Sequence, residues 1–275
     1  MNAADAALAH AADALELAAF DSLAALAPAA AIAAHGLQRT RIAGTLAFAS
    51  RARVGRVYNH VFGAGLTHDL APADLAGLVN FCEVGGAKAC TISVPVGPHA
   101  DRIAQMLRTA GFVWHDPVLR LVRDAAPAPA AASDLRVRAL TGEDADAFGG
   151  VLCSAFPFPE GTREWFGRLT RAPHWRCFGA FEGDTLVGCG ALFMRADHAW
   201  FGMGATLASH RGRGAQSALI AARITAARAA GATLLAAETG DDTPEKPNSS
   251  THNAERLGFR RLYLRPTYAK ALREA

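Results

Sequence analysis

The chain is organised around the stretch Thr206-Leu207-Ala208-Ser209-His210-Arg211-Gly212-Arg213-Gly214-Ala215-Gln216. It lies between an apolar, strand-like run at 199–205 and a long helical run at 217–230. The first amides of a helix lack intrahelical partners and carry partial positive charge, and glycine lets a bound group approach the backbone closely. A strand that passes through a glycine-rich turn into a helix therefore predicts an anion site, and phosphate is the usual anion.

Two well-known phosphate loops do not fit this stretch. A Walker A loop needs a lysine and a hydroxyl directly after its last glycine, and Gly214 is followed by neither. The dinucleotide fingerprint needs a third glycine where Ser217 stands. The segment Arg211-Gly212-Arg213-Gly214 instead resembles the GNAT superfamily of acetyl-CoA-dependent N-acetyltransferases. Arg211 and Gly214 match its pattern, whereas Gln216 stands where glycine or alanine is usual. A plain glycine turn before an amphipathic helix is the alternative.

A second motif supports the resemblance. A short apolar run at 233–237 reads as a buried strand, and Asn248 precedes the pair Gly258-Phe259 by ten residues, a spacing similar to that of the superfamily. The resemblance covers roughly residues 135 to 270. It implies a mixed α/β sheet flanked by helices, with acetyl-CoA as the cofactor.

Composition limits the class of protein. Hydrophobic residues make up 51% of the 275 residues and charged residues 19%, so a globular chain is expected. A net charge of +3, without a basic run that contains aromatics, argues against a nucleic-acid partner. The five cysteines form no C-x-x-C pair, and no signal peptide or spanning segment is recognised, so a cytoplasmic protein without a membrane partner is expected.

A repeated order of elements predicts two domains. Strand, glycine loop, helix, strand, helix, Gly-Phe and strand follow one another at 54–122 and again at 199–269. We therefore expect a tandem of GNAT-like domains, each a mixed, mostly antiparallel sheet flanked by helices. The predicted boundaries are 1–124 for a divergent domain, 125–134 for a Pro/Ala-rich linker, and 135–275 for the catalytic domain. The loop after Phe62 has glycines but no arginine, so only the second domain is expected to bind coenzyme A.

The resemblance implies a set of cofactor-binding residues. The backbone near Leu207 would hold the pantetheine arm, and the amides from Arg211 to Gln216 would hold the pyrophosphate, with Gly214 close enough that a side chain there would block it. The full set is Thr206, Leu207, Ala208, Arg211, Gly212, Arg213, Gly214, Ala215, Gln216, Asn248 and Asn253.

The sequence offers two candidate general bases and lacks the general acid that is usual in the family. The tyrosine acid usual in the family would stand at Ala254, so a general acid is absent there. Glu238, at the end of a predicted strand, is the candidate general base, and His252 is the second candidate. A carboxylate that caps a turn and a solvated helix residue are the respective alternatives. His174, His198 and His210 are not spaced as metal ligands, so no metal is expected.

Two functions are compatible with these residues. The first is an acetyl-CoA-dependent N-acetyltransferase that acts on the primary amine of a small molecule by direct attack on the thioester. The second is an acyl-CoA-binding sensor or regulatory module without catalysis, which the alanine at position 254 favours. A homodimer is compatible with either.

Overall fold

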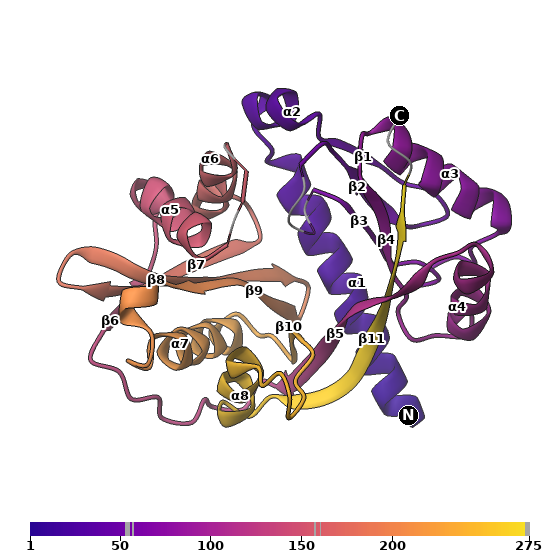
Figure 1. Ribbon diagram of the computed structural model, residues 1–275. Helices are drawn as coiled ribbons and strands as arrows, with labels where there is room; N and C mark the ends of the chain where they lie inside the picture. Colours follow the sequence, from indigo (N-terminus) through magenta and orange to yellow (C-terminus); the bar gives the residue numbers. More distant parts are fainter. Residues whose placement is uncertain (53–55, 57, 157, 160, 273–275) are drawn as a thin grey trace. The chain divides into compact units, whose positions relative to one another are not determined.

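The chain forms two compact units of mixed sheet and flanking helices, as expected (Figure 1). The computed structural model describes residues 1–275 except 53–55, 57, 157, 160 and 273–275. The first unit comprises Met1–Val118 and Tyr263–Ala275, and the second comprises Leu119–Leu262.

The first unit is built on the sheet order β1-β2-β3-β4-β11. Strands β3 and β4 run parallel, and the other neighbours in this order are antiparallel. Its elements are α1 (Ala3–Ala25), α2 (Ala29–His35), β1 (Gln38–Thr40), β2 (Leu46–Ala49), β3 (His60–Phe62), α3 (Pro72–Val84), β4 (Ala89–Ser93), α4 (Ala100–Thr109) and parts of β5 (Val113–Asp124) and β11 (Arg260–Ala271).

Pro28 marks the break between the first two helices. Helix α1 runs on to Ala25, and Pro28 is the residue that caps the start of α2. Proline has no N–H to donate and its fixed φ suits a helix start, so α1 ends before it and α2 begins after it. The predicted strand at 54–62 includes positions outside the described residues, and its described part is β3.

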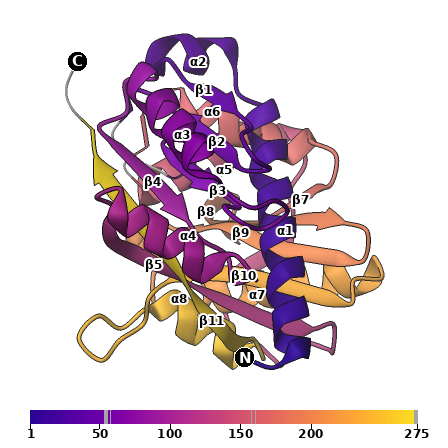
Figure 2. The same cartoon turned by 90° about the vertical axis from the view of Figure 1, so that its right-hand side faces the viewer.

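The two faces of the first sheet pack against different helices. Successive strand residues point to opposite faces. Phe62 stacks on Phe20 of α1 with ring centroids 4.3 Å apart, whereas Val61 lies in the core that α3 and α4 cover with Leu78 and Ile103. Figure 2 views this unit from the side of α3 and α4.

The second unit has the sheet order β5-β10-β9-β8-β7-β6. Helices α5 and α6 lie on one face of its strands and α7 on the other (Figure 1). Its further elements are β6 (Arg136–Ala139), α5 (Ala145–Ala155), α6 (Thr162–Gly167), β7 (Trp175–Glu182), β8 (Thr185–Arg195), β9 (His198–Thr206), α7 (Ala215–Ala229), β10 (Leu234–Gly240) and α8 (Ser249–Arg256), with short 3-10 turns at 142–144, 168–171 and 208–210.

Two strands pass from one unit into the other, which the predicted boundaries did not anticipate. The end of β5 belongs to the second unit, where Leu119 and Leu121 join the core with Ile224 and Leu235. The end of β11 belongs to the first unit, where it pairs with β4 from Thr267↔Ser93 to Ala271↔Ala89. The compact units are therefore discontinuous in sequence.

Buried ion pairs also hold the end of β11 in the first unit. Arg265 donates from Nη1 to Asp13 Oδ1 at 2.9 Å and from Nη2 to Glu16 Oε1 at 3.0 Å, and all three side chains are at most 2% exposed. Removal of one partner from such a buried set leaves an uncompensated charge, which is strongly destabilising. These contacts fix α1 against β11.

Candidate functional site

The ends of β9 and β10 separate within the second unit. Their parallel register runs from Leu234↔His198 to Ala237↔Phe201, yet β9 continues to Thr206 and β10 to Gly240. A strand edge without a neighbour presents its backbone N–H and C=O groups. Residues 202–206 therefore offer such groups along the edge that β10 leaves, at the carboxyl ends of parallel strands, where ligands gather in α/β sheets.

A β-bulge shapes this part of β9. The register with β8 passes from Cys189↔Ala205 to Ala191↔Gly202, so two residues of β9 face one residue of β8. Met203, in the bulge, has φ 53°. A positive φ is strained for a side chain of this kind and persists only where the surroundings enforce it.

The turn after β9 leads into the start of α7, as the sequence predicts. Gly212 and Gly214 have φ of 79° and 76°, and Gly214 caps α7 without a side-chain cap. The first amides of α7 therefore point out of the helix without intrahelical partners. A Cβ at Gly212 would meet nothing within 4 Å, whereas one at Gly214 would clash with the carbonyl oxygen of Ala132. Gly214 thus makes room for the linker, and a side chain there would meet the linker backbone first.

The two arginines of the turn have different roles. Arg213 donates to Asp134 and Glu182, and these bonds raise the pKa of Arg213 and lower the pKa of Asp134. Hydrogen bonds from His210 and Arg213 lower the pKa of Glu182. Arg211 is exposed and has no ion-pair partner among the residues that the structure describes. Arg211 is therefore the arginine that remains available for an anion.

Other predicted cofactor residues have structural partners. The Leu207 N–H donates to Val187 O at 2.9 Å, so this amide is already used. Thr206 Oγ1 accepts from Gln216 Nε2 at 2.9 Å. Ala215 is buried at the start of α7, and Ala208 begins the exposed 3-10 turn before it.

Glu238 lies at the point where β9 and β10 separate. It is the first residue of β10 beyond the last parallel pair, and its side chain is 15% exposed. Its Oε2 is 3.8 Å from Nη1 of Arg120, a fully buried side chain of β5. A guanidinium at this distance stabilises the carboxylate anion. Arg120 was not among the residues predicted from the sequence, although a lone arginine between Leu119 and Leu121 in an apolar strand is a signal.

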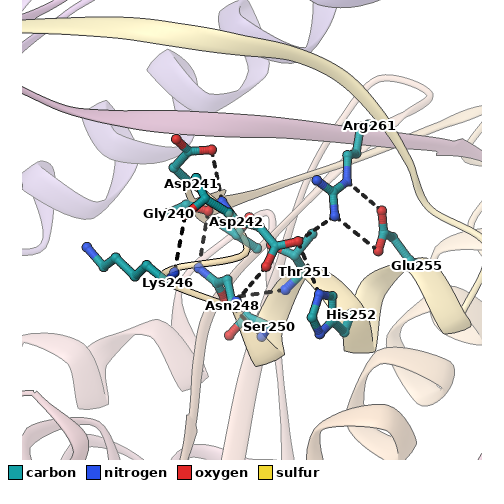
Figure 3. Close-up of polar contacts among 12 residues, drawn as sticks. Gly240, Asp241, Asp242, Lys246, Asn248, Ser250, Thr251, His252, Glu255 and Arg261 are labelled. Atoms are coloured by element: carbon teal, nitrogen blue, oxygen red, sulfur yellow. Dashed lines mark hydrogen bonds and ion pairs between the residues drawn. The ribbon is translucent and has the colours of Figure 1, made fainter.

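His252 is part of a different cluster, which is centred on Asp242 (Figure 3). Its Nε2 lies 3.1 Å from Asp242 Oδ2, and the same carboxylate accepts from Arg261 Nη2 at 2.5 Å and from the Asn248 N–H at 2.6 Å. The Asn248 hydrogen bond, Arg261 and His252 together lower the pKa of Asp242. The cluster fastens the loop at 241–247 and engages the imidazole of His252.

The side chains of Asn248 and Asn253 hold helix α8 in place. Asn248 Oδ1 accepts from the Ser250 N–H at 3.0 Å and its Nδ2 donates to Gly240 O at 3.1 Å, as a helix cap does (Figure 3). Asn253 Oδ1 accepts from Ser217 Oγ of α7 at 3.4 Å. Ala254 is buried in α8. The second motif therefore supports the site by fixing α8 and the end of β10.

Replacement of Asp242 by asparagine is expected to lower the unfolding temperature by about 2–4 °C at pH 7, a shift typical of one lost interaction in a domain of this size. The folded-state pKa of Asp242 is lowered, so its contribution is complete above the ordinary carboxyl pKa and is lost as the pH falls through the folded value. Thermal unfolding at pH 3 to 7 should show the difference from wild type shrinking in acid. Asp241→Asn is the control, since among the described residues the Asp241 carboxylate accepts only from the adjacent Asp242 N–H. An equal difference at every pH would contradict this role.

Comparison with known proteins agrees with this geometry. Residues 143–265 match the family model described as Acetyltransferase (GNAT) family. A search of curated protein sequences gives no match. Among solved structures, the GCN5-related N-acetyltransferase from Sphaerobacter thermophilus is 16% identical with a TM-score of 0.60, and covers 86% of this chain and 76% of its own.

Two further structures share the fold. The GCN5-related N-acetyltransferase from Kribbella flavida has a TM-score of 0.58 at 14% identity, over 85% of this chain and 89% of its own. A tandem GNAT protein from the clavulanic acid biosynthesis pathway has a TM-score of 0.52 at 16% identity, over 72% and 69%.

The family match indicates an acyltransferase of the acetyl-CoA-dependent kind. Residues 143–265 therefore carry a GNAT acetyltransferase domain, the kind of domain that uses acetyl-CoA as its acyl donor. The fit to this donor rests on the open face at Gly212 and the first amides of α7. Within the described part of the chain, no group of three or more His, Cys, Asp or Glu is placed to hold a metal ion. No single described helix is long and apolar enough to cross a membrane, and only the bent pair α1 and α2 passes that test together.

Proposed function

We propose that the enzyme acetylates the primary amine of a small molecule, and that the amine attacks the thioester directly where β9 and β10 separate. The observation that carries this proposal is the position of Glu238. This residue follows the last parallel pair between β9 and β10, and beyond that pair β9 leads into the turn before α7. Bound acetyl-CoA supplies an acyl group activated as a thioester.

The donor site would use three parts of the second unit. The amides at the start of α7 and the exposed guanidinium of Arg211 would hold the pyrophosphate. The unpaired edge at 202–206 would hydrogen-bond the amide groups of the pantetheine arm, as a strand edge does with an extended chain. Because Leu207 N–H is engaged with Val187, the backbone contact expected at Leu207 moves to these earlier residues.

Glu238 would act as the general base, directly or through one water. A bond forms between the amine nitrogen and the carbonyl carbon, the carbon–sulfur bond breaks, and the ammonium proton passes to the Glu238 carboxylate. Arg120 favours the ionised carboxylate that this step needs. His252 is the weaker candidate, since its imidazole is engaged with Asp242.

The departing thiolate would need no protein acid. Ala254 offers no donor at the position where the family commonly has tyrosine. A thiol is acidic enough to leave as the thiolate, so loss of that acid does not abolish turnover. The same alanine is the one observation that favours the second candidate, an acyl-CoA-binding sensor without catalysis.

The first unit would be a divergent GNAT-like domain. Its order β3, α3, β4, α4, β5 parallels the order β9, α7, β10, α8, β11 of the second unit, and β3 and β4 are likewise parallel. The turn at 63–71 contains no arginine, which supports the proposal that this half has lost donor binding.

An amine panel tests the proposed function. Purified protein is incubated with acetyl-CoA and small primary amines, and release of free thiol is followed together with the mass of the products. We expect at least one amine to give an N-acetyl product and thiol in equal amounts. Tight CoA binding without turnover on any amine would instead support the sensor, and turnover confined to peptide or protein amines would contradict the small-molecule substrate.

A further inference from the structure

Helix α7 directs two long polar side chains, Gln216 and Arg223, toward strands β8 and β9. They are seven residues apart and therefore lie on one face of the helix. A helix face that packs on a sheet is normally apolar, because a buried polar group costs free energy unless it is hydrogen-bonded. The two side chains therefore need a structural or functional reason.

Arg223 binds backbone at one end of the β9 bulge. Its Nη1 donates to Ala191 O at 3.1 Å and to Gly202 O at 3.3 Å, and its Nε donates to Leu219 O at 3.1 Å. The side chain is 3% exposed and lies 5.2 Å from the centroid of the Phe201 ring. Burial lowers the pKa of Arg223 to about 10, so the guanidinium still carries its charge at neutral pH.

Gln216 binds backbone at the other end of the bulge. Its Nε2 donates to Ala205 O at 2.8 Å and lies 3.3 Å from Cys189 O. It is the residue that departs from the small side chain usual at this position. Glutamine at this position supplies a hydrogen-bond donor, which a small residue lacks, and its side chain reaches β8 as well as β9.

The four strand carbonyls form two cross-strand pairs. Cys189↔Ala205 and Ala191↔Gly202 are the last regular pairs on either side of the bulge, and Gln216 binds the first pair while Arg223 binds the second. Glycines make room for both side chains: a Cβ at Gly190 would lie 2.7 Å from Arg223 Cζ, and one at Gly204 would lie 3.1 Å from Gln216 Oε1.

We propose that Gln216 and Arg223 are positioning residues that hold the bulge of β9 in the shape that receives the pantetheine arm of the acyl donor. This inference rests on the proposed donor site along residues 202–206. The two side chains donate to the carbonyls that flank the bulge on both strands, so they keep Met203 in its strained conformation. Because the Gly202 carbonyl and the Met203 N–H share one peptide unit, the bound guanidinium also polarises that N–H.

The test uses full-length protein and two variants that keep side-chain length. Gln216→Met removes the donor without adding charge, and Arg223→Lys keeps the charge but loses the fork of donors. Thr225→Ala and Arg228→Lys are controls on the exposed face of the same helix. Calorimetry measures the affinity for CoA and for 3′-phospho-ADP, which keeps the pyrophosphate and lacks the pantetheine arm, and thermal unfolding reports stability.

We expect Gln216→Met to weaken CoA binding by about tenfold and Arg223→Lys by about threefold, as loss of one or two hydrogen bonds does. Affinity for 3′-phospho-ADP should stay within error, and the controls should match wild type for both ligands. An equal loss for both ligands, or a lower unfolding temperature with unchanged CoA affinity, would overturn the positioning role. Failure of the wild type to bind either ligand would overturn the proposed donor site instead, so the two failures can be told apart.

Discussion

Glu238→Gln is expected to lower kcat by about a hundredfold or more while the affinity for CoA stays at the wild-type value. General-base catalysis typically contributes about a hundredfold to ten-thousandfold. Glutamine keeps the size of the side chain but cannot accept the proton of the attacking amine. Since the site of pyrophosphate binding is assigned to the α7 turn, the loss should be confined to the chemical step.

The pH dependence separates a base from a structural carboxylate. A base must be ionised, so wild-type kcat/KM should fall on the acid side as Glu238 gains a proton, and Glu238→Gln should lack this limb. Glu245→Gln is the matched control, because Glu245 lies exposed in the loop at 241–247. If Glu238→Gln kept near-normal kcat with the acid limb in place, Glu238 would be a rim residue, and His252→Ala would then test the other candidate.

Local sequence patterns predicted the part of the fold that carries the proposed donor site. The strand at 199–205, the glycine turn and the helix that follows correspond to β9, the turn and α7, because alternation, glycine and helix start signals are all encoded within a few residues. Thr141 likewise caps the 3-10 turn at 142–144 by accepting from the Glu143 N–H, two residues away in the sequence. These features depend on neighbours in the sequence.

Features that depend on distant partners were not predictable in the same way. The apolar pattern of β11 identifies a strand, but not that its end pairs with Thr91 and Cys90 of the first unit. Likewise, the sequence marks Arg213 as a phosphate contact, whereas the fold supplies it with Asp134 and Glu182. An arginine can bind any nearby anion, so its partner is decided by which carboxylates the fold brings close.

The reasons for glycine at position 214 were likewise only partly predictable from the sequence. Glycine is required there by a positive φ and by the close approach of the linker at Ala132, and the sequence indicates only the positive φ. The open face of the turn belongs to Gly212. A test of the anion site must therefore use Gly212, where a new side chain meets no protein atom.

Gly212→Asp is expected to weaken CoA binding at least about thirtyfold more than Gly212→Asn does. Asparagine and aspartate have the same shape and tolerate a positive φ better than other residues, so both variants should fold alike. Only aspartate places a negative charge beside the bound pyrophosphate. Two unit charges about 4 Å apart repel by about 4 kcal/mol at an effective dielectric constant near 20, and half of that corresponds to about thirtyfold in affinity.

Calorimetry with CoA at low and high salt measures this difference. The loss of CoA affinity in Gly212→Asp beyond that in Gly212→Asn should shrink as salt is added, because exposed charges are screened. Arg211→Gln should weaken binding less than Gly212→Asp, since it removes one attraction from an exposed side chain and adds no repulsion. If both Gly212 variants bound CoA as tightly as wild type at low salt, the pyrophosphate would lie elsewhere and the α7 turn would be a structural glycine turn alone. The alternative interpretation of the motif, a plain glycine turn before an amphipathic helix, would then be correct. A role of the edge at 202–206 in donor binding would need separate evidence.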